Sequence, residues 1–375
     1  MQYLETISRT KSASWYRMCG DYQGEVQRWV VSTPQTVEIC NRPELCGVEF
    51  SSALSRGMTA ALATAPFADF LRTQPSNQLC IMNFLRGSLN FDLRNAVSNA
   101  LGSGYHATCF MSSQRFRKDG RWYVKEDMYR KLKIPDGAVL LVGDVVATGV
   151  TVDNGLDVIM ETLAQHKTSI KALVFFTIGC HTLEKILEEH HRQFTEMFPG
   201  YEQTHVVYLE GKFRLVTPET RVVIGIPGTD LIRLDSLLAP EFESSQFDTV
   251  SGPLERCTIY DAGSRAFDVG EYLDDVTRYW EQVQRLARRG YTLFEALLER
   301  WPAKEYASRK RFDKAKAQQW KGVPKEFTDE LWQKHRKRWK GEFKKWAQTR
   351  EALECVCEDR LGILQELARQ IGRER

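Results

Sequence analysis

Apolar residues follow two different periods along residues 54–226. Runs of apolar and β-branched residues predict strands, and a period near 3.6 between these runs predicts helices. The predicted strands cover residues 79–84, 105–111, 138–146, 170–178, 205–209 and 221–226. The predicted helices cover residues 54–72, 89–101, 152–166 and 182–197. This alternation predicts βαβ units and therefore an α/β fold with a doubly wound, mainly parallel sheet.

The strand predicted at residues 138–146 is apolar at almost every position, which is typical of a strand buried on both faces of a parallel sheet. In such sheets, ligands bind at the carboxyl ends of the strands. Residues 112–133, in contrast, are charged and aromatic without a clean period. We expect a long mobile loop there, and loops of that length in compact domains are often functional.

Beyond residue 256 the pattern becomes helical, with predicted helices at residues 272–289 and 293–300. Thr328 is expected to be the N-cap of a later helix that carries three tryptophans at a spacing of seven residues: Trp332, Trp339 and Trp346. A last apolar stripe runs to the end of the chain. We therefore expect an N-terminal segment at residues 1–60, an α/β core at 61–256 and a helical C-terminal region at 257–375.

The charge is unevenly distributed along the 375 residues. Residues 304–350 contain 16 of the 52 Lys and Arg residues and 6 of the 49 Asp and Glu residues, so the remainder has 36 basic and 43 acidic residues. Two interpretations of this basic segment stay open. It binds nucleic acid through phosphates and stacking, or its tryptophans pack on the core or on a second subunit while the cations are solvated. We favour packing.

Other features limit the class of protein. Hydrophobic residues make up 42% of the chain and charged residues 27%, which argues against disordered and fibrous proteins. The nine cysteines include no CxxC pair, so we expect buried thiols and no zinc site. The N-terminus lacks the apolar segment of a signal peptide, and no apolar run is long enough to span a bilayer. We expect a cytoplasmic protein that does not contact membranes.

The chemistry is predicted to lie at the end of the central strand, in the sequence VLLVGDVVATGVT at residues 139–151. A buried strand ends there in Asp144 and a small, hydroxyl-rich turn, and a helix begins at once. Backbone N–H groups and the positive end of the helix then point at one place, which suits a monophosphate. Neither GxGxxG nor GxxxxGK[ST] occurs in this stretch, which counts against a dinucleotide site or a P-loop.

These thirteen residues resemble the phosphoribosyl-pyrophosphate (PRPP) motif of the type I phosphoribosyltransferases, and the layout is closest to the uracil-type enzymes. By this resemblance, Asp144 hydrogen-bonds the ribose hydroxyls. The 5′-phosphate of PRPP is expected on the five residues of the turn, Ala147, Thr148, Gly149, Val150 and Thr151.

Two positions depart from the family pattern. Gly143 stands where the first of two acidic residues is usual, so one of the ribose-binding carboxylates is missing. Ala147 replaces the Asp by which hypoxanthine-guanine enzymes assist their base, which makes a 6-oxopurine acceptor less favoured. Whether the missing first acid weakens or abolishes catalysis stays open at this point.

The resemblance extends to the pyrophosphate site. Leu85, Arg86, Gly87 and Ser88 follow the first core strand, where the family has a short loop, often with a cis peptide bond, that binds pyrophosphate. The charged stretch after residue 111 falls at the position of the mobile catalytic loop of the uracil-type enzymes. Arg115 and Arg117 are candidates there to bind pyrophosphate. The residues expected to act in catalysis are Asp144, Arg115 and Arg86.

Candidates for the acceptor site come from a shorter likeness. Asp261, Ala262, Gly263 and Arg265 resemble the stretch by which uracil phosphoribosyltransferases recognise their base, with Ser264 in place of the second Asp. A capped loop is the alternative for this segment. His181 and residues 227–230 also follow predicted strands. We do not assign His181 as a base. For residues 227–230 we favour a plain turn, and a role at the acceptor site stays open.

The function implied by the resemblance is transfer of ribose 5-phosphate from PRPP to a nitrogenous acceptor, pyrimidine-like or unusual, with release of pyrophosphate. Mg²⁺ would bind with PRPP, and no direct metal ligand from the protein is expected. A homodimer is the default assembly. Two alternatives stay open: a regulator that senses PRPP or nucleotides and binds nucleic acid through its basic C-terminal helices, and a scaffold or toxin-defence component without catalysis.

Overall fold

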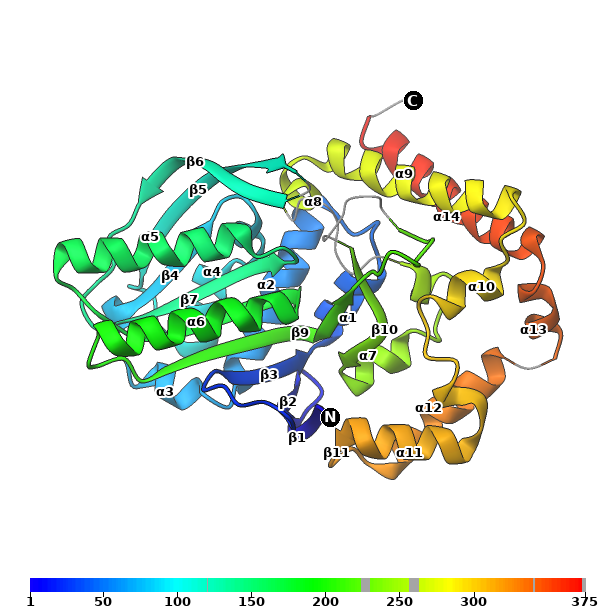
Figure 1. Cartoon of the computed structure of the whole chain (residues 1–375), viewed down its shortest axis with the longest axis horizontal. Helices are drawn as coiled ribbons and strands as arrows, with labels where there is room; N and C mark the ends of the chain where they lie inside the picture. Colours follow the sequence, from blue (N-terminus) through cyan, green and yellow to red (C-terminus); the bar gives the residue numbers. More distant parts are fainter. Residues whose placement is uncertain (120, 224–229, 256–262, 340, 373–375) are drawn as a thin grey trace.

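A computed structural model describes residues 1–119, 121–223, 230–255, 263–339 and 341–372. Its strands form one sheet in the order β11-β1-β2-β3-β9-β8-β7-β4-β5-β6, and β10 pairs with β9 (Figure 1). The parallel centre consists of β3 (Gln27–Ser32), β9 (Gln203–Leu215), β8 (Ile170–Cys180), β7 (Ala138–Val146), β4 (Leu79–Phe84) and β5 (Ala107–Lys118). The predicted α/β class with a doubly wound, mainly parallel sheet is therefore confirmed.

Helices cover both faces of this parallel centre. Figure 1 shows α5 (Val150–His166) and α6 (His181–Met197) on one face, with α2 (Gly47–Thr64) and α4 (Leu93–Leu101) on the other. The sequence predicted one helix over residues 54–72, but α2 ends at Thr64 and α3 (Ala68–Arg72) follows it. The break occurs because Ala65 precedes a proline and has the extended conformation, ψ 141°.

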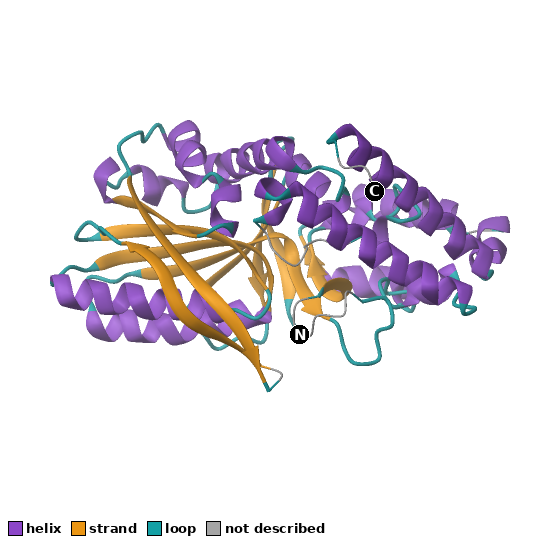
Figure 2. Cartoon of the chain, turned by 90° about the horizontal axis from the view of Figure 1, so that it is seen from above, coloured by secondary structure: helices purple, strands orange, loops and turns teal. Residues whose placement is uncertain are grey.

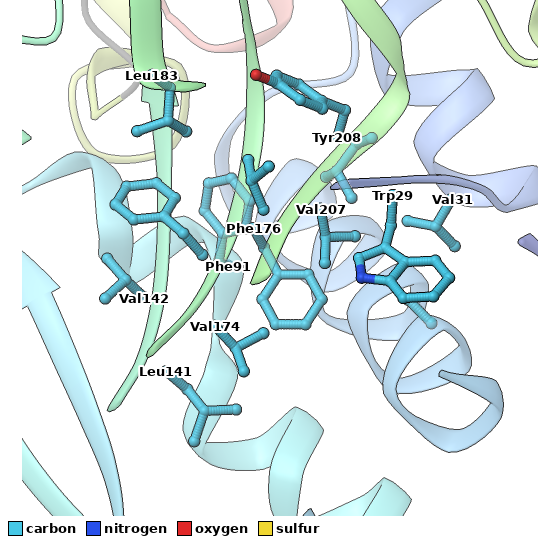
Figure 3. Close-up of a cluster of buried hydrophobic side chains, with 14 of the residues drawn as sticks. Trp29, Val31, Phe91, Leu141, Val142, Val174, Phe176, Leu183, Val207 and Tyr208 are labelled. Carbon is cyan, nitrogen blue, oxygen red and sulfur yellow. The ribbon is translucent and has the colours of Figure 1, made fainter. Parts of the chain in front are cut away.

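The main hydrophobic core lies between these helices and the sheet, and Figure 3 shows a part of it. Phe91, Val142, Phe176 and Tyr208 belong to this cluster and are all fully buried. The bounds of β4 and β7 are those predicted, because burial on both faces gives these strands an almost entirely apolar sequence.

The prediction of a mobile loop at residues 112–133 is wrong. Most of that stretch belongs to an antiparallel hairpin of β5 and β6 (Arg121–Lys131), and Figure 2 shows this hairpin projecting beyond the rest of the sheet. Phe116 and Tyr123 lie opposite each other with ring centroids 5.6 Å apart, and both are about 40% exposed. The pattern misled because the hairpin carries exposed aromatic side chains such as Phe116 and Tyr123, so its strands lack the usual alternation of apolar and polar residues.

The N-terminal residues also join the sheet, which the sequence did not predict. Strands β1 (Tyr3–Arg9) and β2 (Ser14–Cys19) pair antiparallel, and β2 pairs with β3. Helix α1 (Pro34–Asn41) then begins at a capping box formed by Thr33 and Thr36. The strand predicted at residues 221–226 is not formed at 221–223, and its remainder lies outside the described residues. Strand β10 (Leu231–Leu238) follows.

The C-terminal region forms a second, helical core. Helix α14 (Arg350–Gln370) packs along α9 (Val269–Arg288), beside α10 (Leu293–Leu298) (Figure 1). The other short elements are η1 (Ser76–Gln78), η2 (Gly87–Phe91), α7 (Pro240–Ser245), η3 (Gly252–Leu254), α8 (Ser264–Phe267), η4 (Glu305–Ala307), α11 (Arg309–Gln319) and β11 (Trp320–Lys321). None of the helices in the described ranges combines the length and the apolar character that crossing a membrane requires.

The prediction of a single helix that carries all three tryptophans is wrong. Helix α12 (Lys325–Arg338) begins before Thr328, so Thr328 is not its N-cap, and the helix ends before Trp339. Trp346 lies on a separate helix, α13 (Glu342–Ala347), preceded by Gly341 with φ +57°. Trp332 and Trp339 are partly buried against the hydrophobic cores, whereas Trp346 is 36% exposed. Packing therefore accounts for two of the three tryptophans.

Buried side chains of the C-terminal region contact the segment between α1 and α2, and also Glu255, which follows η3. Arg360 of α14 lies 2.6 Å from Glu255 Oε1 through Nε and 2.9 Å from Glu44 Oε2 through Nη2. The Tyr272 hydroxyl of α9 donates to the Pro43 carbonyl at 2.6 Å. Burial raises the pKa of Glu255 to about 7, and the charge of Arg360 opposes that rise. The helical region is thus attached to the α/β core by charge-assisted contacts.

We predict that Arg360→Ala lowers the free energy of unfolding by about 3 kcal/mol at pH 8, because the buried Glu255 then loses its paired cation and must take up a proton for the chain to stay folded. Without Arg360 the folded-state pKa of Glu255 rises further. At pH 6, Glu255 is protonated in the folded state of both proteins. Above pH 7, it is still protonated in the folded variant but ionised in the folded parent protein. The loss of unfolding free energy is therefore smaller at pH 6. Urea unfolding at both pH values measures this difference.

The matched control is Arg369→Ala on the same helix, whose partner Glu366 is half-exposed. We expect the control to change the free energy of unfolding by less than about 1 kcal/mol at either pH. Equal losses for the two variants would contradict the role assigned to Arg360.

Candidate functional site

The turn after β7 has the backbone that a phosphate site requires. Gly149 is the N-cap of α5 with φ +75°, and its carbonyl accepts from the Asp153 N–H at 2.9 Å, so α5 begins directly behind the turn. A Cβ at Gly149 would also lie 2.3 Å from Ile186 Cδ1 of α6. Glycine suits this position through its left-handed backbone, and a side chain here would also force the end of Ile186 to move. The first N–H groups of α5 have no helical acceptor and point toward the turn.

Asp144 lies half-buried near the end of β7, three residues before Ala147. Its Oδ1 accepts from the Val145 N–H at 2.8 Å, which orients the carboxylate at the carboxyl edge of the sheet. On the neighbouring strand, Cys180 lies next to the turn, and its Sγ is 3.4 Å from the Ala147 carbonyl. Burial raises the pKa of the Cys180 thiol, so it acts as a neutral donor that holds the turn. No pattern in the sequence indicates this contact.

Packing explains why Gly143 replaces an acidic residue. A Cβ at Gly143 would lie 2.5 Å from Cγ of Phe91, a side chain that is fully buried. Phe91 ends η2, and Figure 3 shows it among the buried side chains of the central strands. The structure therefore has no room for a side chain at Gly143 while Phe91 occupies this position.

The predicted pyrophosphate loop lies at the same edge of the sheet. Met82 of β4 pairs with Val142 of β7, so the residues that follow Phe84 are level with the Asp144 end of β7. The peptide bond between Leu85 and Arg86 is cis, where the resemblance predicted one.

Hydrogen bonds hold this loop against the sheet. The Ser88 hydroxyl accepts from the Phe84 N–H at 2.9 Å, and the Leu85 N–H donates to the Met111 carbonyl at 2.7 Å. Gly87 is buried, whereas Arg86 is exposed. The structure thus brings residues 85–88 and 144–151 together, with the side chain of Arg86 at the surface.

Arg115 and Arg117 lie on β5, in the hairpin that continues from the sheet beside this loop. Their backbones pair with Val124 and Trp122 of β6. Their side chains lie outside the described part of the chain, so their contact with pyrophosphate stays a prediction.

The structure describes two of the four predicted acceptor residues. Asp261 and Ala262 lie outside the described residues, and Gly263 precedes α8 as its N-cap. Arg265 is 5% exposed, and its guanidinium donates to three backbone carbonyls, those of Ile39, Arg42 and Leu45. The structure thus gives Arg265 a role in holding the end of α1, and it offers no support for contact with an acceptor.

Within the described ranges, no group of three or more His, Cys, Asp or Glu side chains is arranged to hold a metal ion. Asp144 is the carboxylate that lies at the turn. A Mg²⁺ ion that keeps waters and binds substrate phosphates fits a site with one carboxylate, since this ion seldom needs a cage of protein ligands. Binding of Mg²⁺ with the substrate stays a prediction.

No family model matches this chain, and no curated protein matches its sequence. Among solved structures, the AQ2163 protein from Aquifex aeolicus is 15% identical and covers 52% of this chain and 86% of its own, with a TM-score of 0.35. Adenine phosphoribosyl transferase from Trypanosoma brucei, solved with AMP, pyrophosphate and ribose-5-phosphate, is 13% identical over 48% of this chain and 82% of its own, with a TM-score of 0.30.

A hypoxanthine-guanine phosphoribosyltransferase from Bacillus anthracis is 17% identical over 34% of this chain and 67% of its own, with a TM-score of 0.23. All three TM-scores are below 0.5. The α/β fold is assigned from the strand order of this chain itself.

Proposed function

We propose that this chain is a phosphoribosyltransferase that transfers ribose 5-phosphate from PRPP to a nitrogenous acceptor and releases pyrophosphate. The observation that carries the proposal is the turn after β7, where Gly149 exposes the N–H groups at the start of α5 within a few residues of the Asp144 carboxylate. A phosphate and a pair of hydroxyls on one small molecule fit those two groups.

Each part of PRPP then has its own residues. Residues 147–151 hold the 5′-phosphate through backbone N–H groups and the hydroxyls of Thr148 and Thr151. Asp144 accepts from the ribose hydroxyls. The loop at residues 85–88 and the arginines of the hairpin, Arg115 and Arg117, hold the pyrophosphate, with Arg86 at the exposed end of the loop.

The reaction breaks the bond between the anomeric carbon and the pyrophosphate oxygen and forms a bond from that carbon to an acceptor nitrogen. Mg²⁺, when bound to the pyrophosphate, supplies charge that stabilises the leaving group. The chain's own residues fix the sugar, orient the acceptor and keep water away, since water hydrolyses PRPP. The β5–β6 hairpin projects from the edge that carries the loop at residues 85–88, which suits it to cover the bound pyrophosphate.

Two cations of the basic C-terminal segment make contacts within the chain. Lys334 lies 3.0 Å from Asp248, and Arg338 Nη2 donates to the carbonyls of Phe247 and Asp248 at 2.8 and 3.0 Å. These two cations thus hold α12 against the loop after α7. A nucleic acid would have to compete with these contacts.

We predict that Asp144→Asn lowers kcat/KM for PRPP about 10-fold to 100-fold, since it weakens charge-assisted hydrogen bonds to the ribose hydroxyls. Steady-state pyrophosphate release measures the effect. Glu161→Gln, an exposed position on α5, is the control and should leave kcat/KM unchanged. Unchanged turnover in the Asp144 variant would remove this carboxylate from the proposed site.

Gly149→Ala is predicted to abolish binding of ribose 5-phosphate and to destabilise the fold by about 2 kcal/mol, because the new Cβ meets Ile186 and the left-handed backbone is strained. Gly102→Ala is a matched control, because Gly102 has φ +70° but no atom within 4 Å of its Cβ position. The control should lose about 1 kcal/mol and keep full binding in calorimetry. Normal binding by the Gly149 variant would contradict the role of this turn.

We predict that Gly143→Ala destabilises the fold by about 1–3 kcal/mol through its clash with Phe91. Phe91→Ala alone leaves a cavity, and the double variant should lose clearly less stability than the sum of the two single variants. Denaturant unfolding of the four proteins gives this coupling. Additive losses would show that Phe91 is not what excludes a side chain at Gly143.

A further inference from the structure

A basic hollow lies where α12 and α13 meet the loop after α7. Its volume is about 510 Å³. Six side chains line it: Phe247, Asp248, Lys334, Lys337, Arg338 and Phe343. Figure 1 places α12 and α13 at the end of the molecule away from α5 and α6. Among the described residues, those predicted for the PRPP site do not line this α12–α13 hollow, which is therefore a separate feature.

The lining carries more positive than negative charge. Lys334 lies 3.0 Å from Asp248, which offsets one of the three cations. Lys337 is exposed, and its side chain has no ion pair in the described part of the chain. Arg338 donates to the carbonyls of Phe247 and Asp248, and no described carboxylate pairs with it. Lys337 and Arg338 therefore leave two positive charges at the hollow without a counter-ion.

The excess of positive charge continues over the exposed surface of the same two helices. Arg336 on α12 and Lys344 and Lys345 on α13 are exposed, and none of the three is in an ion pair with a described residue. Glu342 on α13 is also exposed, so one carboxylate accompanies these three cations. Like charges gathered in this way repel one another, and a bound polyanion relieves that repulsion.

Aromatic rings border the hollow as well. Phe343 lines it, and its ring centroid lies 5.6 Å from that of Trp346, one turn later on α13. Trp339 contacts Phe343 edge to face and packs on Phe294 of α10. The helical core thus fixes Phe343, whereas Trp346 beside it is 36% exposed and available to a ligand.

The two interpretations of the basic segment apply to different residues of it. Trp332 and Trp339 pack against the hydrophobic cores, and Lys316 is 3% exposed and lies 3.0 Å from Glu305. Packing within the chain accounts for these side chains. It does not account for Lys337 and Trp346, which are exposed at the hollow and beside it.

The charge and the rings together define the ligand. Proteins that bind single-stranded nucleic acid without reading its sequence combine a positively charged groove with aromatic rings on which bases stack. An acidic peptide would use the cations and leave the ring without a partner. A lipid surface would need a broad apolar face, and Trp346 is the one large apolar side chain that is strongly exposed among the described residues from 304 to 350.

We infer that the α12–α13 hollow binds single-stranded nucleic acid, an activity that goes beyond the proposed transferase function. The phosphates bind Lys337 and Arg338, and a base stacks on Trp346. Competition with contacts inside the chain is limited, because Lys337 has no ion pair among the described residues. Arg338 makes its two carbonyl contacts through Nη2, so its other guanidinium nitrogens remain to donate to phosphate.

The test measures binding of a fluorescein-labelled single-stranded oligonucleotide of about 12 nucleotides to the full chain by fluorescence anisotropy. Two competitors separate the sources of affinity. An abasic strand of the same length has the phosphates without the bases, and polyglutamate supplies carboxylate charge alone. We expect the strand with bases to bind about 10-fold or more tightly than either competitor. Equal affinity for a competitor, or no binding of the strand at low salt, would overturn the inference.

A charge variant locates the site. Lys337→Gln removes one free cation, so the slope of log Kd against log salt concentration should become shallower by about 0.7. Lys314→Gln on α11 is the matched control, because Lys314 is also exposed but does not line the hollow. The control should keep the slope of the parent protein. Equal changes in the two variants would show that the strand follows the net charge of the whole segment, and the hollow would not be the site.

A pair of variants tests the stacking. Trp346→Ala should weaken the strand with bases about 10-fold and leave the abasic strand unchanged, whereas Trp346→Phe, which keeps a ring, should retain most of the affinity. Circular dichroism checks that each variant is folded, and the Lys337 variant tests the site even where the alanine variant is not. A folded alanine variant that binds as the parent protein does, or that loses both strands equally, would contradict a base on Trp346.

Discussion

The proposed PRPP site depends on the backbone of one turn. A strand buried on both faces must pass directly into α5, and the passage is possible because Gly149 adopts φ +75° beneath Ile186. That conformation leaves the first N–H groups of α5 directed out of the sheet without acceptors in the helix. A bound anion satisfies them, and the positive end of the helix favours it further. The positions of the other candidate residues follow from this turn.

The surroundings of the turn are coupled to it by packing. Phe91 follows the pyrophosphate loop in the chain and occupies the space above Gly143, so one element shapes both halves of the candidate PRPP site. The missing first acid is thereby accounted for as a consequence of packing. On the other side, the helical region is fixed to the core by Arg265, Tyr272 and Arg360, which places it over the carboxyl ends of the strands.

The sequence predicted best where burial is complete. The bounds of β4 and β7 could be read from almost entirely apolar runs, and the turn at residues 147–151 from its small residues. The β5–β6 hairpin could not, because its exposed aromatic side chains, such as Phe116 and Tyr123, break the alternation of apolar and polar residues. The N-terminal strands were missed because they join the sheet through β9, a strand about 170 residues later in the chain.

Long-range contacts escaped the sequence for a related reason. Nothing near Gly143 in the chain indicates Phe91, which lies 52 residues earlier. Such a contact is defined by topology and leaves no local motif.

The most direct test of the central claim is a crystal structure of the protein soaked with ribose 5-phosphate. The account predicts the phosphate within hydrogen-bond distance of the backbone nitrogens of residues 148–151, with the ribose hydroxyls at the Asp144 carboxylate. A phosphate bound elsewhere on the molecule, or an empty turn at saturating sugar, would contradict it.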